Sequence, residues 1–173
     1  LASRGAEVTL ISGPVNLSAH HSRIRKIDVE SAHQMYEAAQ EAFSSSDAGI
    51  LCAAVADFTP EIQATTKIKR EKSDLNIRLK PTEDIAAALG KNKKTDQVLA
   101  GFALETNDEI QNAKGKLERK NFDFIVLNSM NDEGAGFRVD TNKISIIDRD
   151  SVVAYPLKKK VRKLYSRPTA PHI

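Results

Sequence analysis

Aromatic residues, cysteine and long apolar runs are scarce in this chain, and each shortage excludes a class of protein. Aromatic residues make up 5% of the 173 residues, so we do not expect the stacking platforms that bind single-stranded nucleic acid. The single cysteine, Cys52, excludes an intramolecular disulfide and is typical of a reducing compartment, which predicts a cytoplasmic protein. No apolar run approaches the roughly 20 residues of a membrane span, and we recognise no signal peptide.

Several motifs of common enzyme classes are also missing. The sequence contains no GxxxxGK[ST] loop, no GxGxxG fingerprint and no Ser-His-Asp order. His20 and His21 have no further ligands at metal-binding spacing, so we assign no metal ligands. Cys52 lies in an apolar run and is predicted to be a buried thiol rather than a nucleophile.

The residues that are present alternate between strand-like and helix-like patterns. This alternation predicts an α/β fold with three layers, in which a mostly parallel Rossmann-like sheet carries helices on both faces. We expect a single nucleotide-binding domain over residues 1–157 and a basic, poorly ordered tail over 158–173. The expected strands are 7–12, 24–28, 50–56, 98–104 and 124–127, the expected helices are 31–43, 82–89 and 106–120, and 143–148 with 152–154 form a C-terminal hairpin.

Polar residues mark where the expected helices begin. Ser31 with Gln34 fits a capping box, and Thr106 with Glu109 fits a second one. Thr82 is the expected N-cap of the helix between them, and Gly90 is expected just beyond that helix.

The strand expected over residues 50–56 is followed by groups that suit a phosphorylated ligand. Asp57 comes directly after it, and Lys67, Lys69 and Arg70 follow in a polar segment, 59–78, that we interpret as a flap. Ligands of open α/β sheets bind beyond the carboxyl ends of strands. A carboxylate there can bind ribose hydroxyls, and clustered cations can bind phosphates. A loop aspartate and a solvated charged loop remain the alternative interpretations.

Two further positions fit the same ligand. Lys116 and Lys120 are four residues apart, so they share a helix face; they also balance the helix dipole, which explains them without any ligand. Phe102 follows Gly101 within a strand and is placed to cover a base, although an ordinary core phenylalanine is the alternative.

Taken together, these segments resemble the bacterial phosphopantothenate–cysteine ligase family. The resemblance runs from about Gly5 to Asp148. The segments that carry it are Gly-Pro-Val at 13–15, Ala-Ala-Val-Ala-Asp-Phe at 53–58, Lys-Ile-Lys-Arg at 67–70, Gly-Phe-Ala-Leu-Glu-Thr at 101–106, Lys-Leu-Glu-Arg-Lys-Asn-Phe-Asp at 116–123 and Ile-Val-Leu-Asn at 125–128.

The resemblance implies an activity and partners. Members of this family join 4′-phosphopantothenate to cysteine in coenzyme A biosynthesis, through an acyl-cytidylate made from CTP with Mg²⁺; eukaryotic members use ATP. The family is dimeric, so a homodimer is implied. In many bacteria the domain is fused behind a flavin-dependent decarboxylase. Neither a nucleic acid nor a membrane is an expected partner.

The resemblance also implies roles for individual residues. Lys67 would be the catalytic residue, on a flap that neutralises phosphate charge. Asp57 would hold the nucleoside, Phe102 would contact the base or ribose, and Lys116 and Lys120 would bind phosphates. The remaining nucleotide contacts implied by the resemblance are Cys52, Ala53, Ala54, Glu83, Asp84, Ile85 and Ala86.

The chain departs from the family pattern at both ends. The family's first strand and following loop, which form part of the phosphopantothenate pocket, have no counterpart here, so we expect no ligase turnover from this chain alone. The residues after Leu157 do not show the helix that usually ends the family's domain. Two alternatives stay open: a non-catalytic Rossmann-like nucleotide-binding module, and a nucleic-acid-binding protein, which the pI of about 9.0 suggests and the scattered charge disfavours.

Overall fold

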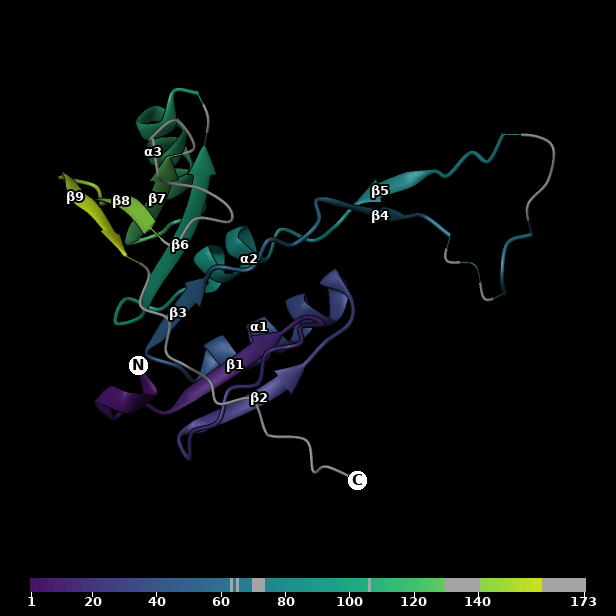
Figure 1. Ribbon diagram of the computed structural model, residues 1–173, viewed down its shortest axis with the longest axis horizontal. Coiled ribbons are helices and arrows are strands. Elements are labelled where there is room, and N and C mark those ends of the chain that lie inside the picture. The colour runs from purple at the N-terminus through teal and green to yellow at the C-terminus, as the bar shows by residue number, and fades with distance from the viewer. Residues whose placement is uncertain (63, 65, 70–73, 106, 130–140, 160–173) are drawn as a thin grey trace.

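A computed structural model describes residues 1–62, 64, 66–69, 74–105, 107–129 and 141–159 of the chain (Figure 1). Helices and strands alternate along most of it. In chain order, the elements are η1 (Ala2–Arg4), β1 (Val8–Ser12), β2 (Ile24–Asp28), α1 (Ala32–Ser44), β3 (Ala48–Leu51), β4 (Phe58–Pro60), β5 (Leu79–Pro81), α2 (Ile85–Asn92), β6 (Val98–Glu105), α3 (Glu109–Arg119), β7 (Phe124–Ser129), β8 (Thr141–Ile147) and β9 (Val152–Lys159).

The strands of the main sheet that are connected through helices run parallel to one another. Its five strands lie in the order β3-β6-β7-β8-β9, with β3, β6 and β7 parallel and β8 and β9 added as an antiparallel hairpin. Strands β1 and β2 form a separate parallel pair. These observations confirm the α/β class, the Rossmann-like parallel sheet and the C-terminal hairpin.

The core lies between one face of the main sheet and helices α1, α2 and α3. Phe43 of α1, Leu89 of α2 and Leu117 of α3 belong to one buried cluster. The sheet residues in this cluster occupy alternate positions of their strands, as expected for a single face: Leu99, Ala103, Ile125, Leu127 and Ile147. On the other face, Phe102 is 47% exposed. Among the described residues, the helices therefore pack on one face of the main sheet, whereas the sequence predicted helices on both faces.

The third expected strand is shorter than the sequence suggested. β3 ends at Leu51, whereas the apolar run predicted a strand through Ala56. β3 pairs with β6 and has no second neighbour among the described strands, so within them it lies at the edge of the main sheet. The chain leaves the sheet after Leu51, and Cys52 is exposed, which corrects the prediction of a buried thiol.

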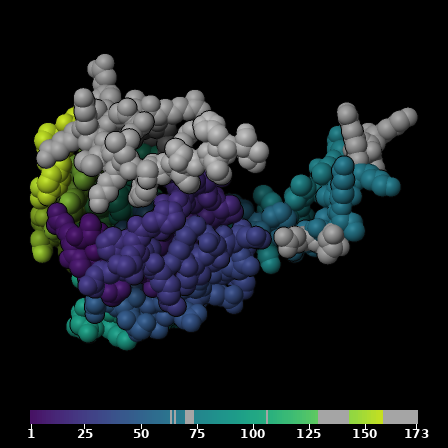
Figure 2. All heavy atoms as spheres, turned by 60° about the horizontal axis from the view of Figure 1, so that its bottom comes forward, coloured from purple at the N-terminus to yellow at the C-terminus, as the bar shows by residue number. Residues whose placement is uncertain are grey.

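The segment between β3 and α2 forms an arm that projects from the body of the molecule (Figures 1 and 2). We call the described residues of this segment, 58–62, 64, 66–69 and 74–81, the arm. β4 and β5 pair antiparallel near its base, with Thr59 opposite Lys80. The predicted flap is thus an extended, hairpin-like projection. Apolar side chains along it are exposed, among them Phe58 at 58% and Leu75 at 63%.

The helix boundaries partly follow the predicted caps. The Ser31 hydroxyl accepts the Gln34 N–H and the Gln34 side chain accepts the Ser31 N–H, which confirms the first capping box. The other two predicted caps are wrong. The N-cap of α2 is Asp84 rather than Thr82, and the N-cap of α3 is Asp108, at a φ of 45°, rather than Thr106, which lies outside the described residues.

Gly90 lies inside α2 rather than beyond its end. A Cβ atom at Gly90 would overlap the backbone carbonyl of Lys120, so glycine lets α2 approach the end of α3 closely. The Asn121 side chain donates a hydrogen bond of 2.9 Å to the Gly90 carbonyl across the same contact. The glycine therefore allows close helix packing. A rule that interprets glycine as the end of a helix does not distinguish these two roles.

The C-terminal hairpin is longer than predicted. β9 extends to Lys159, so the first two residues of the predicted tail are in a strand, and the rest of that tail lies outside the described residues. No helix found in the described part of the chain has the length and apolar character needed to span a bilayer.

Candidate functional site

The base of the arm is joined to the segment that precedes α2. The Thr82 N–H donates to the Asp57 carbonyl at 2.9 Å, and the Thr82 hydroxyl donates to the Ala56 carbonyl at 2.7 Å. Two predicted nucleotide-binding segments, 52–57 and 83–86, are therefore brought together beside the carboxyl end of β3. This is the sheet edge at which ligands of α/β folds bind.

The start of α2 is held by an ion pair from α3. Lys120, the C-cap of α3, places its ammonium 3.1 Å from Asp84 Oδ1, and the same oxygen accepts the Ala87 N–H at 3.0 Å. Burial alone would raise the pKa of Asp84, but the hydrogen bonds from Ala87 and Lys120 outweigh it and lower that pKa. One oxygen of this carboxylate is thus engaged by both the helix cap and Lys120.

The second predicted phosphate-binding lysine is also paired. Lys116 lies one turn before Lys120, and its ammonium is 2.6 Å from the carboxylate of Glu105. Glu105 is the last residue of β6 and its side chain is 15% exposed. Sequence reasoning missed Glu105, because a separation of eleven residues across a strand–helix junction matches no local pairing rule.

A histidine contacts the same region from α1. His33 Nδ1 lies 2.8 Å from Glu83 Oε1. The N–H of Glu83 itself is the main cause of a lowered pKa for that carboxyl, and the hydrogen bond to His33 acts in the same direction. Sequence reasoning did not assign His33 to the site, because it is 50 residues from Glu83; the structure makes it a neighbour of the segment before α2.

Other predicted residues lie apart from these pairs. Phe102 is on the sheet face opposite α2 and α3, since the neighbouring Gly101 points toward the Phe122 ring. Lys67 and Lys69 are exposed on the arm, which projects away from the body (Figure 1), and Arg70 is outside the described residues. Ala53 and Ala54 are exposed between β3 and the arm.

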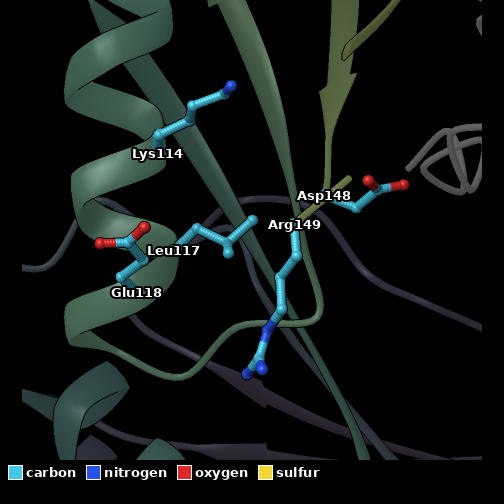
Figure 3. Close-up of a pocket in the computed structure, with 5 residues that line it drawn as sticks. All are labelled: Lys114, Leu117, Glu118, Asp148 and Arg149. Carbon is cyan, nitrogen blue, oxygen red and sulfur yellow. The ribbon is translucent and has the colours of Figure 1, made fainter. Parts of the chain in front are cut away.

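A separate hollow of about 360 Å³ lies beside α3. Figure 3 shows Lys114 and Leu117 on the helix and Asp148 and Arg149 on the turn after β8. None of the predicted site residues lines it. Among the described residues, no group of three His, Cys, Asp or Glu side chains could hold a metal ion.

Comparison with known proteins identifies the family of this chain. Residues 1–164 match the model of the DNA/pantothenate metabolism flavoprotein C-terminal domain. The chain belongs to this family. Its expected resemblance to the ligase domain of coenzyme A biosynthesis is therefore confirmed at the level of the domain.

Individual relatives agree with the family. The chain is 44% identical over 146 residues to the coenzyme A biosynthesis bifunctional protein CoaBC of Bacillus subtilis, covering 84% of this chain and 36% of that protein. It is 56% identical over 160 residues to a protein named cysteine/cysteine sulfinic acid decarboxylase, from an unknown prokaryotic organism, covering 92% of this chain and 45% of that protein. The chain thus spans less than half the length of these two relatives.

A solved structure also matches. The crystal structure of the C-terminal domain of CoaBC superposes with a TM-score of 0.73 at 33% identity, covering 92% of this chain and 69% of that one. The fold of this chain is therefore that of the CoaBC C-terminal domain.

Proposed function

We propose that this chain provides the nucleotide-binding part of a ligase that joins 4′-phosphopantothenate to cysteine at the expense of CTP. One observation carries the proposal. In a family whose relatives include CoaBC proteins, the predicted segments 52–57 and 83–86 and the predicted lysine Lys120 lie together at the carboxyl edge of the sheet. Three segments far apart in sequence thus meet where a nucleotide would bind.

The proposed reaction has two steps. In the first step, the carboxylate of 4′-phosphopantothenate attacks the α-phosphorus of CTP, and the bond from that phosphorus to the oxygen of the β-phosphate breaks. Pyrophosphate departs, and the product is an acyl-cytidylate. The cysteine amine then attacks the acyl carbon, loses a proton, forms the amide and displaces CMP. Negative charge grows on the departing pyrophosphate in the first step, so cations fixed near it lower the barrier.

The proposed roles divide the site between two ends of the nucleotide. Asp57 and the exposed backbone of 52–54 would bind the nucleoside, with Phe102 at the base or ribose. The backbone of 83–86 at the start of α2 and the ammonium groups of Lys116 and Lys120 would bind the phosphates. Lys67, exposed on the arm, would approach the phosphates from the flap as the catalytic residue.

Mg²⁺ would enter this site with the triphosphate. Protein Mg²⁺ sites commonly use one or two carboxylates together with substrate phosphates. Bound in this way, the ion would screen the triphosphate charge.

The proposed setting is a cytoplasmic homodimer. The arm supports the dimer, because it projects from the body with Phe58, Ile68 and Leu79 each more than half exposed, and a second subunit would bury them. The exposed thiol of Cys52 fits a reducing compartment. A flavin-dependent decarboxylase would be the fused or associated partner.

Pyrophosphate release tests the proposal. The full-length protein that contains this chain is mixed with CTP, Mg²⁺, 4′-phosphopantothenate and cysteine, and pyrophosphate and CMP are measured. We expect both products with CTP and little of either with ATP. Binding of CTP without any product would favour the non-catalytic nucleotide-binding module, and binding of nucleic acid that falls steeply with salt would favour the nucleic-acid alternative.

A second candidate comes from the 56% identical relative, whose name specifies decarboxylation of cysteine or cysteine sulfinic acid. The same reaction mixture separates it from the ligase when CO₂ is measured as well. Release of CO₂ from cysteine alone, without CTP and 4′-phosphopantothenate, would support the decarboxylase. Release of pyrophosphate that requires both substrates would support the ligase.

A further inference from the structure

The ion pair between Glu105 and Lys116 joins two elements at the edge where the nucleotide would bind. Glu105 ends β6 and Lys116 lies in the second half of α3. Their nearest side-chain atoms are 2.6 Å apart, a short and therefore well-formed charge-assisted hydrogen bond. The carboxylate side is 15% exposed and the ammonium side 39%, so the pair is buried at its acidic end and open at its basic end.

This asymmetry determines what the lysine can do. If Lys116 moved away, Glu105 would remain as a mostly buried carboxylate without its partner, which is strongly unfavourable. Lys116 is therefore expected to remain beside Glu105 when an anion arrives. An ammonium group has three N–H donors, and the hydrogen bond to Glu105 uses one of them.

We propose that Glu105 is a positioning residue, which holds the Lys116 ammonium in place for the phosphates of the nucleotide. The inference rests on the proposed CTP site and adds a residue to it. A lysine side chain in solvent loses several rotatable bonds when it binds a phosphate. Glu105 fixes that side chain before the ligand arrives, so less freedom is lost on binding.

The Lys120–Asp84 pair differs from this arrangement. Asp84 is 52% exposed and also caps α2, so removing it would disturb a helix as well as a lysine. Glu105 is in a strand and caps no helix, which makes it the cleaner position for a test.

The test is calorimetric titration of the purified protein with CTP and Mg²⁺, together with thermal unfolding of each variant. For Glu105→Gln we expect the dissociation constant for CTP to rise about three- to tenfold, the range for losing one preordered side chain. Two variants are controls. Glu118→Gln removes an exposed carboxylate from α3, the helix that carries Lys116, and should leave both measurements unchanged. Asp123→Asn breaks a different ion pair, with Lys93, and should lower the unfolding temperature without changing CTP affinity.

The outcomes are separable. Unchanged or tighter CTP binding by Glu105→Gln, with wild-type binding intact, would overturn the positioning role and leave the proposed function standing. If the wild-type protein does not bind CTP, the proposed function fails and this inference fails with it. An equal loss of affinity in Asp123→Asn would show that general destabilisation is the cause, and would also overturn the proposal.

A conservative pair of variants covers the case in which glutamine is not tolerated at this position. Glu105→Asp keeps the charge but withdraws the carboxylate by one methylene, so CTP affinity should fall. Adding Lys116→Arg, which provides a longer side chain, should restore part of the loss. No fall in Glu105→Asp, or a fall with no recovery in the double variant, would overturn the proposal.

Discussion

Lys120 at the end of α3 places its ammonium 3.1 Å from the Asp84 carboxylate, which caps α2. The contact links two helices across 36 residues of sequence. It also fixes a cation beside the first turn of α2, where backbone N–H groups are not paired within the helix. The two features that attract a phosphate, a helix start and a lysine, are thus held by one carboxylate.

We predict that substitutions of Asp84 separate the cap from the ion pair. Asp84→Asn keeps a good N-cap and loses the ion pair, so the free energy of unfolding should fall by about 0.5 kcal/mol, as for an exposed pair. Asp84→Ala loses both and should cost about 1–2 kcal/mol. Urea unfolding of both variants measures the difference. Equal costs would show that the cap contributes nothing.

Acid should destabilise the protein through its paired aspartates. Burial would raise the pKa of Asp123, but hydrogen bonds from Lys93 and the Leu99 N–H outweigh it and lower that pKa. A lowered pKa in the folded state means that the unfolded state binds protons first as the pH falls. The stabilisation is therefore complete above the ordinary aspartate pKa of about 3.9 and is lost progressively below it.

Urea unfolding at several pH values between 7 and 3 tests this prediction. Wild-type stability should fall at the acid end, and Asp123→Asn should be less stable at pH 7 by about 1–2 kcal/mol with a shallower acid decline. If stability fell with pH in the same way in both proteins, the loss of stability in acid could not be assigned to Asp123.

Two glycines in helices should respond in opposite directions to alanine. Gly90→Ala should destabilise the protein by about 1–3 kcal/mol, because the new methyl would meet the Lys120 carbonyl and force the helices apart. Gly115→Ala in α3 has open space around it, so it should stabilise by up to about 1 kcal/mol through helix propensity. Thermal unfolding of both variants provides the comparison. Stabilisation by Gly90→Ala would show that the contact is not tight.

Lys67→Gln tests the proposed role of the arm. The residue is exposed on an arm that projects from the body, so the fold and unfolding temperature should not change. Pyrophosphate release by the full-length protein should be abolished if Lys67 acts on the phosphates. Lys80→Gln is the matched control, because Lys80 is an exposed lysine of the same arm to which no phosphate contact is assigned, so it should leave turnover unchanged. Wild-type turnover of Lys67→Gln would refute the catalytic assignment.

The sequence predicted the parts of the fold that depend on neighbouring residues. The capping box of Ser31 and Gln34 was found because both partners lie within one helical turn. The parallel order of strands followed from their alternation with helices. The apolar run after Leu51 was assigned to a strand because periodicity alone does not distinguish a buried strand from an apolar segment leaving the sheet.

The contacts of the site required the tertiary structure. Lys116 and Lys120 were identified, but their partners Glu105 and Asp84 become visible only when α3 is packed against β6 and α2. The close approach at Gly90 has the same origin, since it depends on the path of the chain after α3.

The arm interrupts the chain without interrupting the core. It leaves after β3 and returns before α2, while β3 pairs with β6 and Phe43 of α1 shares a cluster with Leu89 of α2. A cut by trypsin after Lys67 or Lys69 would therefore divide the polypeptide but not its hydrophobic interior. The two fragments should remain associated after cleavage, and the protein could be prepared as two separately expressed pieces that assemble on mixing.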